Sequence, residues 1–278
     1  MPVRIVQSKQ NARLKELRKA LATPGREGHG LAGIEGPKLI EEALSAGLLV
    51  TCVFAAQGFE HLLEPLPIPP ETEILLMPRE LLDSALATQA PQPIAALVQL
   101  PDWTWAHVLT PSRNAVPLIA VLAAIQDPGN LGTILRSAEA FGADGVIALP
   151  GTVSGWNPKS IRASAGSIFR LPMITATVSE CFTNLREGGV RILTTTVRAA
   201  EPVDLVDLTG AVALIFGNEG NGVPDSIASF ADERVTISCP GAVESLNAAI
   251  AASITLYEAS RQRREQEVKL LGRKGPKR

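Results

Sequence analysis

The chain has 278 residues, of which 46% are hydrophobic and 19% are charged, and its formal net charge is −2. This length and composition allow one large or two ordinary globular domains, each with its own core. The three cysteines are far apart and lack C-x-x-C spacing, which argues against a disulfide framework or a zinc knuckle. No signal peptide and no apolar run long enough for a membrane span is recognisable, so a cytoplasmic protein is expected.

The charges are unevenly distributed along the chain. Residues 1–20 hold six Lys and Arg against one Glu, and residues 261–278 hold eight against two Glu. Basic ends on an acidic body indicate either a polyanionic partner or two solubilising tails.

The first hundred residues are expected to form a basic helix and a small α/β unit. Leu14, Leu17 and Leu21 share one face of a helix at 11–21, within a basic N-terminal segment at 1–27. A unit at 28–100 is predicted from patterning, with helices that start near Pro37 and at 79–86 and strands at 50–56, 73–77 and 95–100. Residues 101–114 have no apolar period and several turn formers, which predicts a linker.

From residue 115 the elements are longer and alternate, which predicts a parallel sheet covered by helices on both faces. The predicted strands are 117–125, 144–149, 190–196, 211–216 and 234–238. The predicted helices are 131–141, 158–168, 179–187, 224–230 and 246–264. We place this second domain at 115–264 and a basic tail at 265–278.

The first motif of interest lies on the helix predicted after the strand that ends near Ile125. Leu131, Ile134, Leu135, Ala138 and Phe141 form an apolar stripe. Arg136 lies on the opposite side of that helix, so it serves either solvent or a ligand rather than the core. Asn130 is either a ligand contact or a helix N-cap.

The second motif is the glycine-rich run that starts at Phe216. Gly217, Gly220 and Gly222 permit close approach to a ligand or a tight structural turn. The spacing matches neither a dinucleotide fingerprint nor a P-loop, and Glu219 would repel a phosphate. The run therefore favours a ligand with hydroxyls, an amine or a cationic centre.

The third motif is the start of the last helix. Ser245 is the predicted N-cap, and the alanine-rich stretch after Asn247 suits close packing against another backbone. The three histidines match no zinc spacing, and no serine-hydrolase elbow exists, so no metal is expected.

Together these motifs resemble the SpoU (TrmH-type) RNA 2′-O-ribose methyltransferases of the SPOUT superfamily. The resemblance rests on N-x-G-x-x-x-R-x-x-x-x-F-G from Asn130, on F-G-N-E-G-x-G-V from Phe216, and on S-L-N at Ser245. The stretch from Gly33 to Gly47 is similar to the start of the ribosomal-protein-like substrate-binding domain that precedes the catalytic domain in many members acting on ribosomal RNA.

The resemblance implies an α/β domain with a deep trefoil knot, a smaller N-terminal α/β domain, a homodimer and S-adenosylmethionine as cofactor. It implies no metal and no membrane. The implied cofactor-binding residues are Phe216, Gly217, Asn218, Gly220, Ile237, Ser238 and Leu246. The implied catalytic residues are Asn130, Arg136, Glu219, Ser245 and Asn247.

The implied activity is 2′-O-methylation of RNA, in which Arg136 would bind the phosphate beside the target ribose and assist deprotonation of the hydroxyl. Because arginine is normally fully protonated, positioning and electrostatic assistance are favoured over direct general-base action. The N-terminal domain favours ribosomal RNA as the substrate. The alternatives are a tRNA methyltransferase and a non-catalytic RNA-binding or ribosome-assembly protein; glycine spacing and Glu219 disfavour a nucleotide-dependent oxidoreductase.

Overall fold

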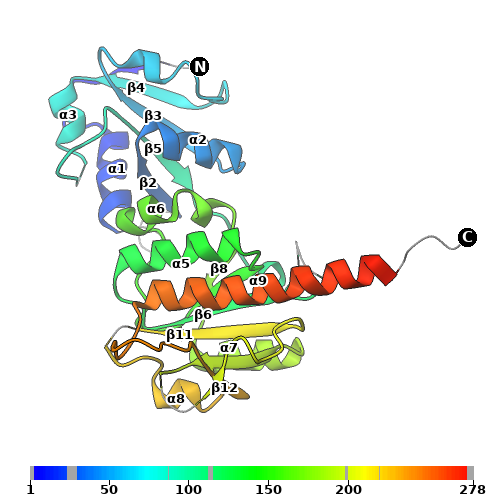
Figure 1. Ribbon diagram of the computed structural model, residues 1–278. Helices are drawn as coiled ribbons and strands as arrows, with labels where there is room; N and C mark the ends of the chain where they lie inside the picture. The colour runs from blue at the N-terminus through cyan, green and yellow to red at the C-terminus, as the bar shows by residue number, and fades with distance from the viewer. Residues whose placement is uncertain are drawn as a thin grey trace, which may run out of the picture. The chain divides into compact units, whose positions relative to one another are not determined.

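The computed structural model describes residues 3–23, 30–86, 88–111, 115–197, 200–218 and 220–273. The chain divides into two compact units (Figure 1). The first contains residues 1–102 and 154–170, and the second contains residues 103–153 and 171–278. The predicted Glu219 lies outside the described residues.

The first unit is a five-stranded mixed sheet with the order β1-β4-β3-β5-β2. Its strands are β1 (Val3–Ile5), β2 (Leu31–Glu35), β3 (Val50–Ala56), β4 (Glu73–Met77) and β5 (Ile94–Gln99). Its helices are α1 (Ala12–Ala22), α2 (Pro37–Ser45), the 3-10 turn η1 (Glu60–Leu62), α3 (Arg79–Asp83), α6 (Pro158–Ser164) and η2 (Ser167–Phe169). The predicted helices and strands of this region are present, while β1 and β2 were not predicted.

A basic helix forms at α1 because its leucines meet the sheet. Leu14 and Leu17 are fully buried in a cluster with Phe54 and Leu97 from the central strands. Asn11 caps the helix by accepting a hydrogen bond from the Leu14 N–H at 3.2 Å. The predicted apolar face of this helix is therefore its packing face.

The second unit is a seven-stranded sheet with the order β10-β12-β9-β11-β6-β7-β8, and every pair of neighbours is parallel. Its strands are β6 (Leu118–Ala123), β7 (Gly145–Ala148), β8 (Met173–Thr175), β9 (Arg191–Thr195), β10 (Glu201–Pro202), β11 (Val212–Gly217) and β12 (Glu233–Thr236). The predicted parallel sheet is confirmed, and the two short edge strands β8 and β10 were missed because each has three residues or fewer. The implied trefoil knot stays a prediction.

Within the described residues, the second unit has five α-helices. They are α4 (Trp105–Leu109), α5 (Pro128–Ala140), α7 (Val178–Glu187), α8 (Asp225–Ala228) and α9 (Ala248–Arg273). Figure 1 shows α5 and α9 side by side over one face of the sheet, with α7 and α8 on the other. The sheet is thus covered on both faces, which explains why all six residues of β6 are buried.

Three predicted element bounds were wrong. The segment predicted as a linker contains α4, which Thr104 and His107 cap reciprocally and whose Val108 packs in the core. The helix predicted at 158–168 ends at Ser164 because Ala165 and Gly166 take left-handed φ values of 49° and 88°. The last helix starts at Ala248 and continues to Arg273, through residues assigned to the basic tail.

The C-terminal helix is tied to the sheet by a buried arginine. The Arg263 side chain donates to the carbonyls of Leu208, Val116, Pro117 and Gly210 at 3.1, 2.9, 3.1 and 2.6 Å. Burial lowers the pKa of this guanidinium. Arg263 therefore joins α9 to the chain entering β6 and to the loop before β11, and it is not a free charge of the tail.

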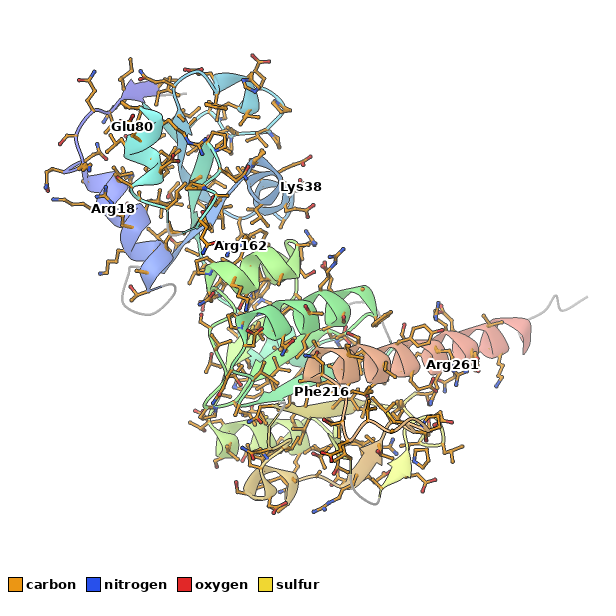
Figure 2. The ribbon with its side chains drawn as sticks, turned by 60° about the vertical axis from the view of Figure 1, so that its left-hand side comes forward. Arg18, Lys38, Glu80, Arg162, Phe216 and Arg261 are labelled. Carbon is orange, nitrogen blue, oxygen red and sulfur yellow. The ribbon has the colours of Figure 1, made fainter. Side chains whose placement is uncertain are left out.

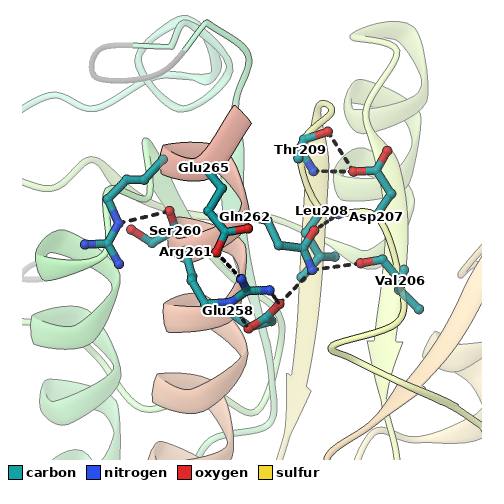
Figure 3. A network of polar contacts seen from close by, with 10 residues as sticks. Val206, Asp207, Leu208, Thr209, Glu258, Ser260, Arg261, Gln262 and Glu265 are labelled. Atoms are coloured by element: carbon teal, nitrogen blue, oxygen red, sulfur yellow. Dashed lines mark hydrogen bonds and ion pairs between the residues drawn. The ribbon is translucent and has the colours of Figure 1, made fainter. Parts of the chain in front are cut away.

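A neighbouring polar network, drawn in Figure 3, also fixes this turn of α9. Gln262 donates to the Val206 carbonyl at 3.0 Å and accepts from the Leu208 N–H at 2.8 Å. Arg261 pairs with Glu258 at 2.7 Å and with Glu265, and this pairing lowers the pKa of the Glu258 carboxyl. Two of the eight cations counted in residues 261–278 are thus used within the fold.

Arg263→Met should lower the free energy of unfolding by about 2–3 kcal/mol, because a hydrogen bond to a charged group contributes about 1.5–3 kcal/mol and methionine keeps only the apolar stem. Urea denaturation would measure the change. Arg264→Met, at the exposed next position, is the control and should change stability by less than about 0.5 kcal/mol. Equal stability of the two variants would contradict the structural role of Arg263.

Candidate cofactor and active site

The first motif begins the helix α5 at the carboxyl end of β6. Asp127 is the N-cap, and its carboxylate accepts from the Asn130 N–H at 2.9 Å. The alternative that Asn130 caps this helix is therefore wrong, since Asn130 lies in the first turn of the helix. The predicted apolar stripe is buried at Leu131, Ile134, Leu135 and Ala138, whereas Phe141 is half-buried and packs edge-on against Tyr257.

The third motif meets the first through a single amide. Asn247 donates from Nδ2 to Oδ1 of Asn130 at 3.1 Å. Its own Oδ1 accepts from the N–H groups of Ala249 and Ile250 at 2.9 and 3.2 Å. Asn247 therefore caps α9 and holds the start of α5 at the same time. The predicted cap at Ser245 was wrong, because the helix starts two residues later than expected.

The glycine-rich loop after β11 folds back on itself. Its first residue, Gly217, has no room for a side chain, since a Cβ there would lie 2.0 Å from the carbonyl carbon of Gly222. The carbonyl of Asn218 accepts from the Gly222 N–H at 3.0 Å, and its side chain accepts from the N–H groups of Gly220 and Asn221 at 3.0 and 2.8 Å. Gly222 has a φ of 65°. The three glycines thus differ in role: close approach, open space and a left-handed turn.

A cavity of about 760 Å³ lies between this loop, the segments that follow β9 and β12, and the start of α9. The carboxyl ends of these strands meet at one edge of the parallel sheet, where ligands of open α/β folds bind. Gly217 contributes from β11, Thr195 from β9, Ile237 and Ser238 from the segment after β12, and Leu246 from the approach to α9.

The lining of the cavity suits a neutral or cationic ligand better than a phosphate. Among its described residues, Arg234 is the sole Lys, Arg or His, while Asp225 and Glu244 are carboxylates. The remainder are glycines, hydroxyl and amide side chains, and small or medium apolar side chains. Such a surface matches an adenosine with its hydroxyls and a positively charged sulfonium, as the sequence argument expected from the loop.

The structure brings six of the seven cofactor-binding candidates to the cavity. Gly217, Asn218, Gly220, Ile237, Ser238 and Leu246 line it. Phe216 does not, because its side chain is 1% exposed and belongs to the interior of the sheet (Figure 2). Ser245 also lines the cavity.

Arg136 stands apart from this cavity. It is exposed on α5, and within the described chain it makes no hydrogen bond or ion pair. Neither Asn130 nor Asn247 lines the cavity, although Asn247 directly follows Leu246, which does. The candidate residues therefore form two groups in a single chain: those that line the cavity, and the hydrogen-bonded pair Asn130 and Asn247 together with Arg136, which do not.

Sequence reasoning missed the contribution of β9. Thr194, Thr195, Thr196 and Val197 line the cavity, as do Asp225, Arg234 and Glu244. The signal available was positional: a parallel strand at 190–196 was predicted, and its carboxyl end must lie at the same edge as that of β11. No residue type in that segment is diagnostic by itself.

Comparison with known proteins supplies a family for this fold and site. Residues 117–257 match the SpoU rRNA methylase family, and residues 11–96 match an MRM3-like substrate-binding domain. The chain is 30% identical over 254 residues to the 23S rRNA (guanosine(2553)-2′-O)-methyltransferase RlmP of Bacillus subtilis, which covers 91% of this chain and 97% of that protein.

The chain belongs to the SpoU methyltransferase family.

Solved structures of relatives agree with this assignment over both units. The chain matches the SpoU methyltransferase AviRb of Streptomyces viridochromogenes, in complex with AdoMet, with 29% identity and a TM-score of 0.79, covering 91% of this chain and 98% of that one. It matches an AdoMet-bound rRNA methyltransferase of Sinorhizobium meliloti with 27% identity and a TM-score of 0.81, covering 93% and 98%. The resemblance inferred from the three motifs is confirmed.

The described residues contain neither a candidate metal cluster nor a candidate membrane helix. In the described ranges, no three His, Cys, Asp or Glu side chains are placed to hold a metal ion. Among those same residues, no helix combines the length and the apolar character needed to cross a bilayer.

The cysteines offer a direct probe of the cavity. Cys239 lines it and is exposed, while burial raises the pKa of the Cys52 and Cys181 thiols to about 12. Because the thiolate is the reactive form, the native protein should react with a thiol reagent at one position near pH 8, and at three after unfolding. Saturating S-adenosylmethionine should slow the native reaction. Rapid labelling that remains in Cys239→Ser, or no protection by the cofactor, would contradict this arrangement.

Proposed function

We propose that this protein transfers a methyl group from S-adenosylmethionine to a ribose 2′-hydroxyl of ribosomal RNA. The observation that carries the proposal is the cavity at the carboxyl ends of β9, β11 and β12, joined through Leu246 and Asn247 to the Asn130 motif. The names of its relatives and its membership of the SpoU family support the same chemistry.

Ribosomal RNA is favoured over tRNA for two reasons. The relative from Bacillus subtilis is named for 23S rRNA, and the match to it extends over both units. The first unit matches a substrate-binding domain. In this proposal residues 28–100 bind RNA, residues 101–114 join the domains and residues 115–264 carry the transfer. Such a protein acts in the cytoplasm, where ribosomal RNA meets its modifying enzymes.

The residues of the cavity fit the cofactor by their chemistry. Gly217 at the end of β11, Ile237 just after β12 and Leu246 just before α9 offer backbone groups to the cavity. Ser238 and Asn218 add polar side chains, and the carboxylates of Asp225 and Glu244 favour a cation. The bound cofactor supplies a methyl group already activated by a positively charged sulfur.

The protein must then orient the hydroxyl and help remove its proton. Asn130 and Asn247 fix the start of α5 relative to the cavity, and Glu219 and Ser245 are assigned to ordering the loops around it. Arg136 binds the phosphate beside the target ribose and stabilises the negative charge that develops on the oxygen. As a guanidinium it acts by position and charge rather than as the base.

A homodimer completes the site in this proposal. Ile250, Ile254 and Tyr257 form an exposed apolar stripe on α9, with exposed fractions of 51, 38 and 46%. Arg136 is exposed on the neighbouring helix and does not line the cavity of its own chain. A second copy that covers the stripe would remove apolar surface from water and could bring Arg136 to the cofactor of its partner.

The rival function is a non-catalytic RNA-binding or ribosome-assembly protein of the same fold. It requires no cofactor and leaves the cavity and the exposed Arg136 without a task. Transfer of radiolabelled methyl groups to large-subunit ribosomal RNA, followed by mapping of 2′-O-methyl positions, decides between the two. Label found only on tRNA would favour the tRNA alternative.

Arg136→Ala should lower methyl transfer by about 10²–10⁴-fold, the range for assisted proton transfer, with cofactor affinity and melting temperature unchanged. The exposed side chain leaves no cavity when it is truncated. Arg136→Lys should restore little, because a point charge does not reproduce a planar, bidentate grip on phosphate.

Thr133→Ala is the matched control, since Thr133 is exposed one turn earlier on the same helix. Near-normal activity of Arg136→Ala would remove Arg136 from the mechanism. Unfolding of that variant would assign it to the fold or to the dimer contact instead.

Gly217→Ala should abolish cofactor binding and lower the free energy of unfolding by about 3 kcal/mol or more, because backbone rather than a flexible side chain occupies the space. Gly220→Ala is the control, since a Cβ there lies 3.7 Å from its nearest neighbour and the residue has no positive φ. Calorimetric titration and urea denaturation would measure both effects. Cofactor binding by Gly217→Ala at wild-type affinity would contradict the inference that the close approach of backbone at Gly217 requires glycine.

A further inference from the structure

The side of α1 that faces away from the sheet carries two exposed lysines. Leu14, Leu17 and Leu21 bury the opposite face in the first unit. Lys15 and Lys19 lie one turn apart on the outward face, and both are exposed. Exposed Lys9 precedes the helix.

The cations of this region divide into paired and unpaired groups. Arg13 is paired with Glu16 at 2.8 Å and with Glu73 at 3.0 Å, which raises its pKa. Arg4 lies 3.5 Å from the same Glu73. Glu16, the acid of α1, is therefore paired with Arg13.

The other cations of this region have no carboxylate partner among the described residues. Lys9, Lys15 and Lys19 make no ion pair with the described residues. Arg18 donates to neutral oxygens alone, the Lys9 carbonyl at 3.1 Å and the Ser84 hydroxyl at 3.2 Å. These two bonds also fix the chain at Lys9 against α1 and against the residue that follows α3.

Three other basic residues, Lys38, Arg261 and Arg263, are paired or buried. Lys38 on α2, labelled with Arg18 in Figure 2, is paired with Glu41 at 3.0 Å and Glu42 at 3.2 Å. At the C-terminal end, Arg263 is buried and Arg261 is paired with two glutamates. At the start of the C-terminal segment two cations are thus held within the fold, whereas Lys9, Lys15 and Lys19 are exposed and have no ion pair among the described residues.

We propose that Lys9, Lys15, Arg18 and Lys19, here called the α1 basic face, bind the sugar-phosphate backbone of the RNA substrate. The proposal rests on the proposed function for the choice of RNA as the polyanion. Lys15 and Lys19 are separated by one helical turn, about 6 Å along the axis, so each can reach a different phosphate of one strand. The exposed neighbours Ala12 and Ala22 are small and leave room for close approach.

The same face has no means of reading bases by stacking. Residues 3–23 contain no aromatic side chain. Lysine is a flexible point charge that suits phosphate rather than a planar base edge. The α1 basic face therefore positions RNA and adds affinity without sequence preference, leaving the choice of nucleotide to the catalytic unit.

The test is the salt dependence of RNA binding by the full-length protein. The probe is a 40-nucleotide RNA stem-loop of mixed sequence, titrated between 50 and 300 mM KCl. Each lost phosphate contact lowers the slope of log affinity against log salt by about 0.7–0.9, so Lys15→Gln/Lys19→Gln should lower its magnitude by roughly 1.5. Glutamine preserves helix propensity, and a melting curve checks the fold.

Two matched control variants test whether the effect depends on the charge of the lysines and on their position on α1. Lys38→Gln removes an equally exposed but paired lysine and should leave the slope unchanged within about 0.3, less than one contact. Lys15→Arg/Lys19→Arg keeps both charges and should keep the slope. A wild-type slope in the glutamine variant, or an equal fall in Lys38→Gln, would overturn the proposal.

Methyl transfer separates this proposal from the proposed function. At saturating RNA and low salt the glutamine variant should retain kcat, with KM for RNA raised about 10-fold. Wild-type protein that binds RNA with the expected slopes but transfers no methyl group would refute the function and leave the α1 basic face intact. Full activity with an unchanged KM for RNA in the glutamine variant would refute RNA binding by the α1 basic face and leave the proposed function intact.

Discussion

The amide of Asn247 is the contact on which the arrangement of the site depends. One oxygen caps α9 through two backbone N–H groups, and one nitrogen reaches Asn130 at the start of α5. The residue before it lines the cavity. Because an amide both donates and accepts, neither aspartate nor alanine can replace it without losing one connection. The cavity edge, the last helix and the Arg136 helix are therefore set by a single side chain.

The carboxyl-end geometry explains why residues so far apart in sequence act together. The carboxyl ends of parallel strands bring Thr195, Gly217 and Ile237 to one edge of the sheet, and α9 begins at that edge and runs over one face of the sheet. Arg263, four turns along that helix from Asn247, anchors it to the chain that enters β6 and β11. The far end of α9 thus stabilises the position of its near end, which forms part of the site.

Much of this arrangement was predictable because it depends on local chemistry. The spacing of apolar residues predicted the central strands and α5. The placement of Arg136 opposite the apolar stripe of α5 followed from the rotation of 100° per residue in an α-helix. What failed depends on tertiary partners. Ser245 is as good a cap as Asn247 in isolation, and the choice between them is made by Asn130, which lies 117 residues away. The strand β9 contributes threonines to the cavity because of its position in the parallel sheet. The residue type alone does not indicate that role.

The charged residues show most clearly that tertiary partners cannot be read from the sequence. Counting Lys and Arg treats Arg263 and Lys19 alike, yet Arg263 is buried on four carbonyls and Lys19 is exposed. The field that a polyanion meets is set by cations left after internal pairing, and pairing is decided by the fold. The one acid of α1, Glu16, is paired with Arg13, and Glu73 of β4 is paired with Arg13 and Arg4, so that Lys15 and Lys19 have no carboxylate partner among the described residues. At the start of the C-terminal basic segment, it is instead basic side chains that are paired or buried within the fold. A chain with a net charge of −2 can therefore still present one strongly basic helix to RNA.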